Sequence, residues 1–227
     1  MTTATSWSKI SDLLLEATSD TLYMVGVSTL LAALLGIPLG VLLHLTAPGG
    51  LSPQPLLNRL LSVVVDFGRS LPFIVLLIAI LPFTRTIAGT TLGPAAAVVP
   101  LTIGAIPFVG RLVDNALREV DASVVEAAVT TGASKFRIVR SVLLREAAPA
   151  VVAAIGVTAI ALVGYSAMAG VVGAGGLGDV AVRFGYHRYD YRVMWVTVAV
   201  LAVLVIAIQL AFDVVARAID RRRRVNA

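Results

Sequence analysis

The sequence has no cysteine and only two histidines, His44 and His187, among its 227 residues. Disulfides, thiolate metal sites and cysteine nucleophiles are therefore excluded, and two isolated imidazoles predict no metal site. Charged residues make up 14% of the chain and hydrophobic residues 58%, whereas soluble domains have about 25% charged and roughly 45–50% apolar residues. This composition argues against a water-soluble globular enzyme and favours a chain that crosses a membrane.

A phosphate-binding loop for ATP is also missing. The only lysines, Lys9 and Lys135, do not follow a glycine at the spacing that the G-x-x-x-x-G-K-[ST] motif requires. Residues 173–178 match G-x-G-x-x-G, but they follow a long apolar run and not a short strand of a βαβ unit. We interpret these glycines as sites of a tight turn or of close backbone approach.

Five apolar runs are long enough to cross a bilayer as helices, since a span needs about 20 residues. They cover residues 21–45, 60–83, 91–113, 147–172 and 193–217. In the second run Asp66 stands three residues before Arg69, so the two can pair on one helix face. The sequence predicts an all-α integral membrane protein with five transmembrane helices in a domain of residues 21–217.

The positions of the arginines predict the orientation of these spans by the positive-inside rule. With the carboxyl terminus in the cytoplasm, twelve of the 18 basic residues fall in inside segments and five outside, and Arg69 lies within the second span. Residues 1–20 then form an extracytoplasmic segment, whose single lysine and three acidic residues are unlike a signal peptide. Residues 218–227 form a basic cytoplasmic tail, and Arg221–Arg224 are expected to bind anionic membrane lipids and not nucleic acid.

The segment 114–146, between the third and fourth runs, carries signals of a folded cytoplasmic loop. Ser123 and Glu126 have the spacing of a capping box, which predicts a helix beginning at Ser123. Gly132 can close that helix in the left-handed conformation, and Ser134 can cap a second helix. A helix of about two turns is not stable alone in water, so it needs a surface to pack against. A partner protein and the bilayer surface are the two alternatives.

Part of this segment resembles a known signature. Residues Glu126-Ala127-Ala128, Gly132 and Val142-Leu143-Leu144 are similar to the E-A-A-x3-G-x9-I-x-L-P pattern of permease subunits of ATP-binding-cassette importers, with Val142 in place of isoleucine and Arg145 in place of proline. In that family the short helix is a coupling helix that docks on the ATPase subunit. The resemblance implies that Glu126, Ala127, Ala128 and Gly132 couple to the ATPase; a self-contained capped loop is the alternative.

Longer stretches narrow this resemblance to the permeases of methionine importers. They are residues 66–74, 81–85, 99–105, 162–170 and 172–178. The resemblance implies the type I importer permease fold, a homodimer in the cell membrane, two ATPase subunits that bind the ATP, and an extracytoplasmic methionine-binding lipoprotein. The chain itself would be no enzyme and would bind no cofactor. Its expected function is import of D- and L-methionine; import of another small amino acid or an osmoprotectant is the alternative.

Two other classes of membrane protein compete with this interpretation. A secondary transporter usually has inverted repeats, which the five spans do not show. A passive membrane scaffold would have no use for a capped cytoplasmic helix that ends in glycine.

The fourth run contains a candidate gate. Tyr165, Ser166 and Met168 lie in its expected outer half. A flexible apolar thioether such as that of Met168 could close a path between two subunits at their symmetry axis. We therefore predict Tyr165, Ser166 and Met168 as translocation-path or gate residues, with core packing as the alternative.

Overall fold

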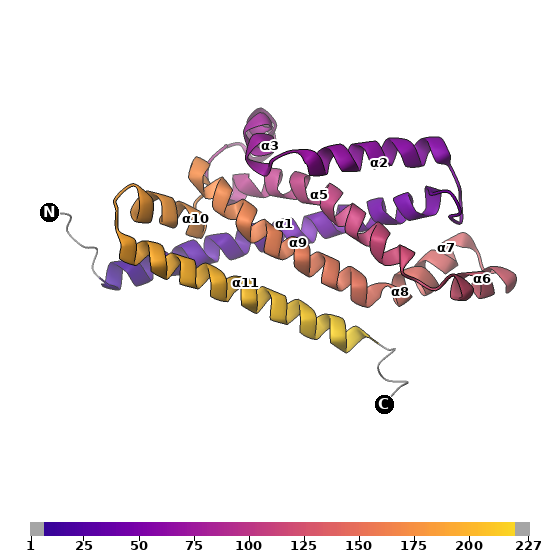
Figure 1. Ribbon diagram of the computed structural model, residues 1–227. Helices are drawn as coiled ribbons and strands as arrows, with labels where there is room; N and C mark the ends of the chain where they lie inside the picture. Colours follow the sequence, from indigo (N-terminus) through magenta and orange to yellow (C-terminus); the bar gives the residue numbers. More distant parts are fainter. Residues whose placement is uncertain (1–6, 221–227) are drawn as a thin grey trace. The chain divides into compact units, whose positions relative to one another are not determined.

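The computed structural model describes residues 7–220, with side chains from Ile10 onward, and every regular element in that range is helical. The chain divides into two compact units. Unit 1 comprises Met1–Leu31, Leu71–Ala105 and Ala159–Ile208, and unit 2 comprises Ala32–Ser70, Ile106–Thr158 and Gln209–Ala227. Four long helices contribute residues to both units: α1 (Trp7–Thr46), α5 (Pro94–Arg118), α9 (Ala148–Ala169) and α11 (Tyr191–Ile219) (Figure 1).

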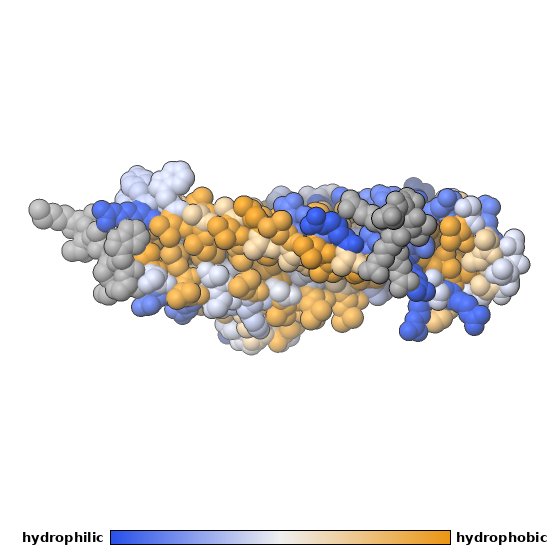
Figure 2. Space-filling model, turned by 90° about the horizontal axis from the view of Figure 1, so that it is seen from below, coloured by the Kyte–Doolittle hydropathy of each residue, from blue (hydrophilic) through white to orange (hydrophobic). Residues whose placement is uncertain are grey.

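Four helical segments within the described range are long and apolar enough to cross a membrane. They are Ile10–Thr46, Pro94–Arg118, Ala148–Ala174 and Tyr191–Ile219. A fifth span results if α2 (Pro55–Ser70) and α3 (Phe73–Ala79) are counted together. Figure 2 shows broad apolar surface, drawn in orange, which includes exposed valine, leucine and isoleucine side chains. Such surface is expected of a protein that faces lipid or partners.

The second predicted span is broken where a single helix was expected. Helix α2 ends at Ser70 and α3 begins at Phe73, with Leu71 and Pro72 between them. Proline disfavours the helical conformation of the residue before it and has no amide hydrogen to donate, and Pro72 itself is non-helical, with ψ of 129°. The run 60–83 therefore contains α2, α3 and the first residues of α4 (Leu81–Ala88).

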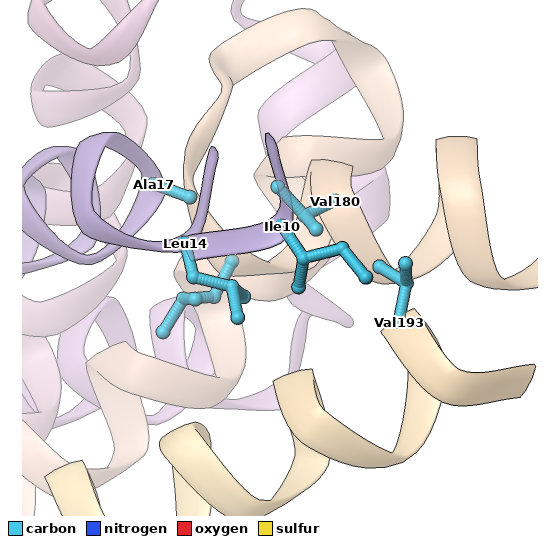
Figure 3. Packing of buried hydrophobic residues seen from close by; sticks show 6 residues of the cluster. Ile10, Leu14, Ala17, Val180 and Val193 are labelled. Carbon is cyan, nitrogen blue, oxygen red and sulfur yellow. The ribbon is translucent and has the colours of Figure 1, made fainter. Parts of the chain in front are cut away.

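The core of unit 1 is aliphatic and surrounds α10 (Gly176–Val180). Ile10, Leu14 and Ala17 lie on one face of α1, at the spacing of three and four residues typical of a buried helical stripe. They pack against Leu177, Val180 and Val193, as Figure 3 shows for five of the six residues. Helix α1 is continuous from Trp7 to Thr46, so the described residues of the predicted segment 1–20 belong to the same helix as the first predicted span.

The glycine-rich residues 173–178 make the close backbone approach that the sequence predicts. Gly176 has a φ of +77°, and a Cβ atom there would lie 2.7 Å from Oγ1 of Thr21. The hydroxyl of Thr21 accepts a hydrogen bond from the amide of Leu177 at 2.9 Å. These contacts join the first residues of α10 to α1, and η2 (Gly170–Ala174) and η3 (Ala181–Tyr186) flank α10 along the chain.

Unit 2 contains a close helix contact. It also contains the segment 114–146, which the sequence predicts to be a folded cytoplasmic loop. A Cβ atom on Gly40 of α1 would lie 2.6 Å from the carbonyl oxygen of Gly110 in α5, so the two backbones approach closely, as small residues allow in membrane helices. After α5 follow α6 (Ala122–Thr130), α7 (Lys135–Ile138), η1 (Val139–Leu143) and α8 (Leu144–Glu146).

Candidate functional site

The predicted coupling helix is α6, which Figure 1 labels next to α7. It has nine residues and no buried side chain. Its N-cap is Asp121, whose carboxylate accepts a hydrogen bond from the amide of Ser123 at 2.9 Å. The predicted start at Ser123, with Ser123 as the cap, is therefore wrong. An aspartate is as good a cap as serine, and its charge also suits the positive end of the helix dipole.

The end of α6 forms as the sequence predicts. Gly132 has a φ of +75°, in the left-handed region. Its amide donates to the carbonyl of Val129 at 3.0 Å, and the amide of Ala133 donates to the carbonyl of Ala128 at 3.2 Å. These two bonds are those of a Schellman motif, which ends the helix sharply. Ser134 then caps α7, accepting from the amide of Arg137 at 3.4 Å.

Most side chains of α6 are exposed. Helix α6 packs against α7 and η1. Glu126 and Ala127 are exposed, Ala128 is partly covered, and the apolar Val124 and Val129 are also exposed. Phe136 of α7 is 73% exposed, which sequence reasoning did not anticipate. An uncovered short helix with apolar and acidic side chains is suited to docking on another protein.

A cavity of about 640 Å³ opens beside α6 within unit 2. Its wall includes Val120, Val124 of α6, Glu146 of α8 and Asp220 after α11. Arg145, which stands where the importer signature has proline, lies in α8 and also lines this cavity. The segment around Arg145 stays helical, so the missing proline leaves the local path of the chain helical up to Glu146.

An ion cluster that sequence reasoning missed lies near the end of α5. Asp114 is buried, with 1% of its side chain exposed. Nε and Nη2 of Arg118 donate to its two carboxylate oxygens at 3.1 and 3.2 Å, and Nη1 of Arg111 donates to Oδ2 at 3.4 Å. Nδ1 of His44 lies 3.9 Å from Oδ1 of Asp114. The available signal was an acidic residue with arginines three positions before and four after it, on one helix face.

The predicted pair of Asp66 and Arg69 forms, but it is not the shortest contact of Asp66. Nη1 of Arg69 lies 3.9 Å from Oδ1 of Asp66, whereas Nη2 of Arg111 donates to the same oxygen at 2.7 Å. The guanidinium of Arg69 also lies 6.0 Å from the ring centre of Phe108. Arg111 therefore joins the carboxylates of Asp66 and Asp114.

The three predicted gate residues have different surroundings in unit 1. The ring of Tyr165 stacks on Phe73 of α3, with ring centres 4.6 Å apart and planes 3° apart. Ser166 is buried, and its hydroxyl donates to the carbonyl of Val163 in its own helix at 2.8 Å. Met168 is 45% exposed. Of the three, Met168 presents the most surface to a substrate or a second subunit.

Within the residues that the structure describes, no group of three or more histidine or acidic side chains is placed to hold a metal ion.

Comparison with known families decides the class of this protein. The family model for the inner membrane component of binding-protein-dependent transport systems matches residues 36–225. The chain belongs to this family. Its membership and its apolar helices make it a transport component that crosses the membrane several times.

Individual family members are similar over almost the whole chain. The probable D-methionine transport system permease protein MetI of Vibrio cholerae is 55% identical over 212 residues, which cover 93% of this chain and 94% of the relative. The methionine import system permease protein MetP of Bacillus subtilis is 44% identical over 207 residues, 91% of this chain and 93% of the relative.

A solved structure confirms the predicted fold class. An inward-facing structure of the MetNI methionine ABC transporter contains a chain that is 46% identical and superposes with a TM-score of 0.93, covering 96% of this chain and 100% of that chain. The type I importer permease fold that the sequence resemblance implied is therefore correct.

Proposed function

We propose that this protein is the membrane-spanning permease subunit of an ATP-driven methionine importer, with D- and L-methionine as substrates. The observation that carries the proposal is the match to a chain of the MetNI methionine ABC transporter over 96% of this chain. The relatives named as methionine permeases in Vibrio cholerae and Bacillus subtilis support it. The permease forms the translocation path and performs no bond chemistry of its own.

The working assembly in this proposal is a homodimer of the permease with two ATPase subunits, which bind and hydrolyse the ATP. One coupling helix, α6, is present per chain in the described range, so two ATPases acting as a pair require two permeases. Closed symmetry makes a homodimer the simplest arrangement. An extracytoplasmic lipoprotein delivers methionine to the outer face.

Helix α6 is the ATPase-docking element of the proposal. Its two ends are fixed by Asp121 and by the turn at Gly132, so it can move as a rigid piece. Glu126 offers an exposed carboxylate for a basic residue of the ATPase, and Ala127 and Ala128 allow close approach. When ATP closes the ATPase pair, the two α6 helices are drawn together and the permease changes from inward-facing to outward-facing.

The orientation and the gate complete the proposal. The amino terminus is extracytoplasmic and α6 cytoplasmic, which follows from the distribution of arginines. The exposed thioether of Met168, beside the stacked ring of Tyr165, narrows the path, and Ser166 holds the local helix through its bond to Val163. The lipid-anchoring residues Arg221–Arg224 lie outside the described residues.

Capture of the ATPase tests the docking. The tagged permease is co-expressed with the ATPase subunit of a methionine importer, and Glu126→Lys or Gly132→Asp is expected to abolish capture and methionine uptake. Glu16→Lys is the matched control, because it reverses an exposed charge in unit 1 and is expected to leave capture intact. Full capture by both α6 variants would contradict the docking role.

Competition for uptake tests the substrate. Uptake of labelled methionine in proteoliposomes that hold the full transporter should be inhibited by unlabelled D- and L-methionine and not by other small amino acids or osmoprotectants. Stronger inhibition by one of those compounds would favour the alternative substrate.

A further inference from the structure

We propose that the buried carboxylate of Asp114 is a positioning residue that transmits the movement of α6 to α1 and α2. The inference rests on the proposed docking of α6 to an ATPase. The ion cluster around Asp114, called here the Asp114 cluster, has members on three helices of unit 2. They are His44 of α1, Asp66 and Arg69 of α2, and Arg111, Asp114 and Arg118 of α5.

The cluster begins next to the coupling helix. Arg118 is the last residue of α5, and only Glu119 and Val120 separate it from Asp121, the cap of α6. Arg118 donates a hydrogen bond to each carboxylate oxygen of Asp114. A two-point bond between a guanidinium and a carboxylate fixes direction as well as distance. A displacement of the start of α6 therefore acts on Arg118 and through it on Asp114.

From Asp114 the contacts continue to the two neighbouring helices. Arg111 bonds Asp114 with one nitrogen and Asp66 of α2 with the other, at 3.4 and 2.7 Å. His44 places α1 next to the same carboxylate. Asn58 joins α1 and α2 directly, since its side-chain amide donates to the carbonyl of Leu43 at 2.8 Å. Helices α1, α2 and α5 are thus connected around one buried charge.

A second connection leaves the coupling segment at its other end. Nζ of Lys135, the first residue of α7, donates to Oγ of Ser52 in the connection between α1 and α2 at 3.3 Å. The residues from 119 to 134, which contain α6, are therefore attached on both sides to the α1–α2 hairpin. Apolar side chains can slide past one another, whereas hydrogen-bonded charges hold one register, so this attachment suits the transfer of a directed movement.

The charges of the cluster make Asp114 the member with the largest expected effect. Two carboxylates face three guanidinium groups, and Asp114 is the carboxylate that is buried, whereas the side chain of Asp66 is 59% exposed. Without the charge of Asp114, Arg111 and Arg118 lose the carboxylate to which both donate. Loss of the Asp66 charge is compensated by water.

The test compares ATP hydrolysis with methionine uptake in one preparation. The full transporter carrying Asp114→Asn is reconstituted in proteoliposomes and both rates are measured. We expect ATPase capture and hydrolysis close to those of the wild type and uptake lowered by about tenfold, within the range typical of coupling between sites. Equal losses of both rates, or an unchanged ratio, would overturn the inference. Asp66→Asn is the matched control, with a much smaller change in the ratio.

A distance measurement separates positioning from a purely structural role. Because the chain has no cysteine, spin labels can be placed on Ala122→Cys in α6 and Leu60→Cys in α2. Dimers in which only one permease carries the two labels report the distance within one permease. In the wild-type background this distance should stay narrow with and without ATP and vanadate, since the two helices move together. In Asp114→Asn it should broaden on ATP binding. Identical distributions in both backgrounds would overturn the inference.

A further variant covers the case in which Asp114→Asn does not assemble. Arg118→Lys keeps the charge but loses the two-point bond, and should raise the ATP hydrolysed per methionine by a smaller factor. An unchanged ratio would overturn the inference while the docking proposal stands. If the wild type itself captures no ATPase, the proposed function fails instead.

Discussion

Each of the two units is stabilised internally by a different kind of interaction. Around α10, unit 1 relies on aliphatic side chains and on glycines that bring backbones together, and its ion pair between Asp179 and Arg183 lies within four residues of one chain segment. In unit 2, ion pairs connect α1, α2 and α5 around Asp114. The difference indicates that the region around α10 in unit 1 depends on shape, whereas unit 2 combines close helix packing with directed contacts between charged side chains of different helices.

Removing the buried carboxylate should have the largest effect on stability. Asp114→Ala removes the carboxylate that Arg111 and Arg118 share. Because Arg118 is half exposed and Arg111 keeps its bond to Asp66, the cost is that of the lost hydrogen bonds between charged groups, about 3 kcal/mol. The matched variant Asp179→Ala breaks the more exposed pair of unit 1 and should cost about 1 kcal/mol or less. Thermal melting of the purified permease in detergent measures both. Equal losses of stability in the two variants would contradict the inferred difference between the units.

Adding a methyl group in unit 1 should have the next largest effect. A Cβ atom on Gly178 would clash with Cα of Ala167, whereas one on Gly164 would meet nothing within 4 Å. Gly178→Ala should therefore destabilise the protein by about 1–3 kcal/mol, and Gly164→Ala should be close to neutral. The two melting temperatures decide this. A stable Gly178→Ala variant would show that unit 1 is not limited by shape.

Gly132 differs from Gly178, because a side chain at Gly132 is disfavoured by the backbone conformation and not by lack of space. A side chain there meets nothing within 4 Å, but the φ of +75° disfavours it by about 1–2 kcal/mol. Gly132→Ala should lower uptake more than it lowers the melting temperature, since the strain is confined to the end of α6, the proposed docking helix. Gly132→Asn should be milder, because asparagine tolerates this conformation. Equal effects of the two substitutions would contradict this reason.

The smallest effect is expected at the start of α6. Asp121→Ala removes the cap and should destabilise the helix by about 1 kcal/mol, whereas Ser123→Ala leaves the cap in place. Hydrogen exchange of the amides of residues 122–130 should quicken in the first variant and not in the second. The reverse order would restore Ser123 as the cap.

Local signals in the sequence were accurate where the structure depends on local chemistry. Gly132 and Ser134 occupy the conformations that their residue types favour, and the glycines of residues 173–178 turn the chain against α1. The choice between Ser123 and Asp121 failed because both residues are good caps and stand two positions apart. The break at Pro72 was not predicted, because hydropathy alone shows a continuous apolar run.

The sequence alone determined the membrane class, the helical fold and the position of helix α6, because hydropathy over about 20 residues and the residues at helix ends act over short distances along the chain. Only the tertiary structure showed that Arg111, Asp114 and Arg118 meet Asp66 and His44. Asp66 and Arg111 are 45 residues apart in the chain. Such a contact depends on how whole helices pack, which the spacing of residues within each helix does not specify.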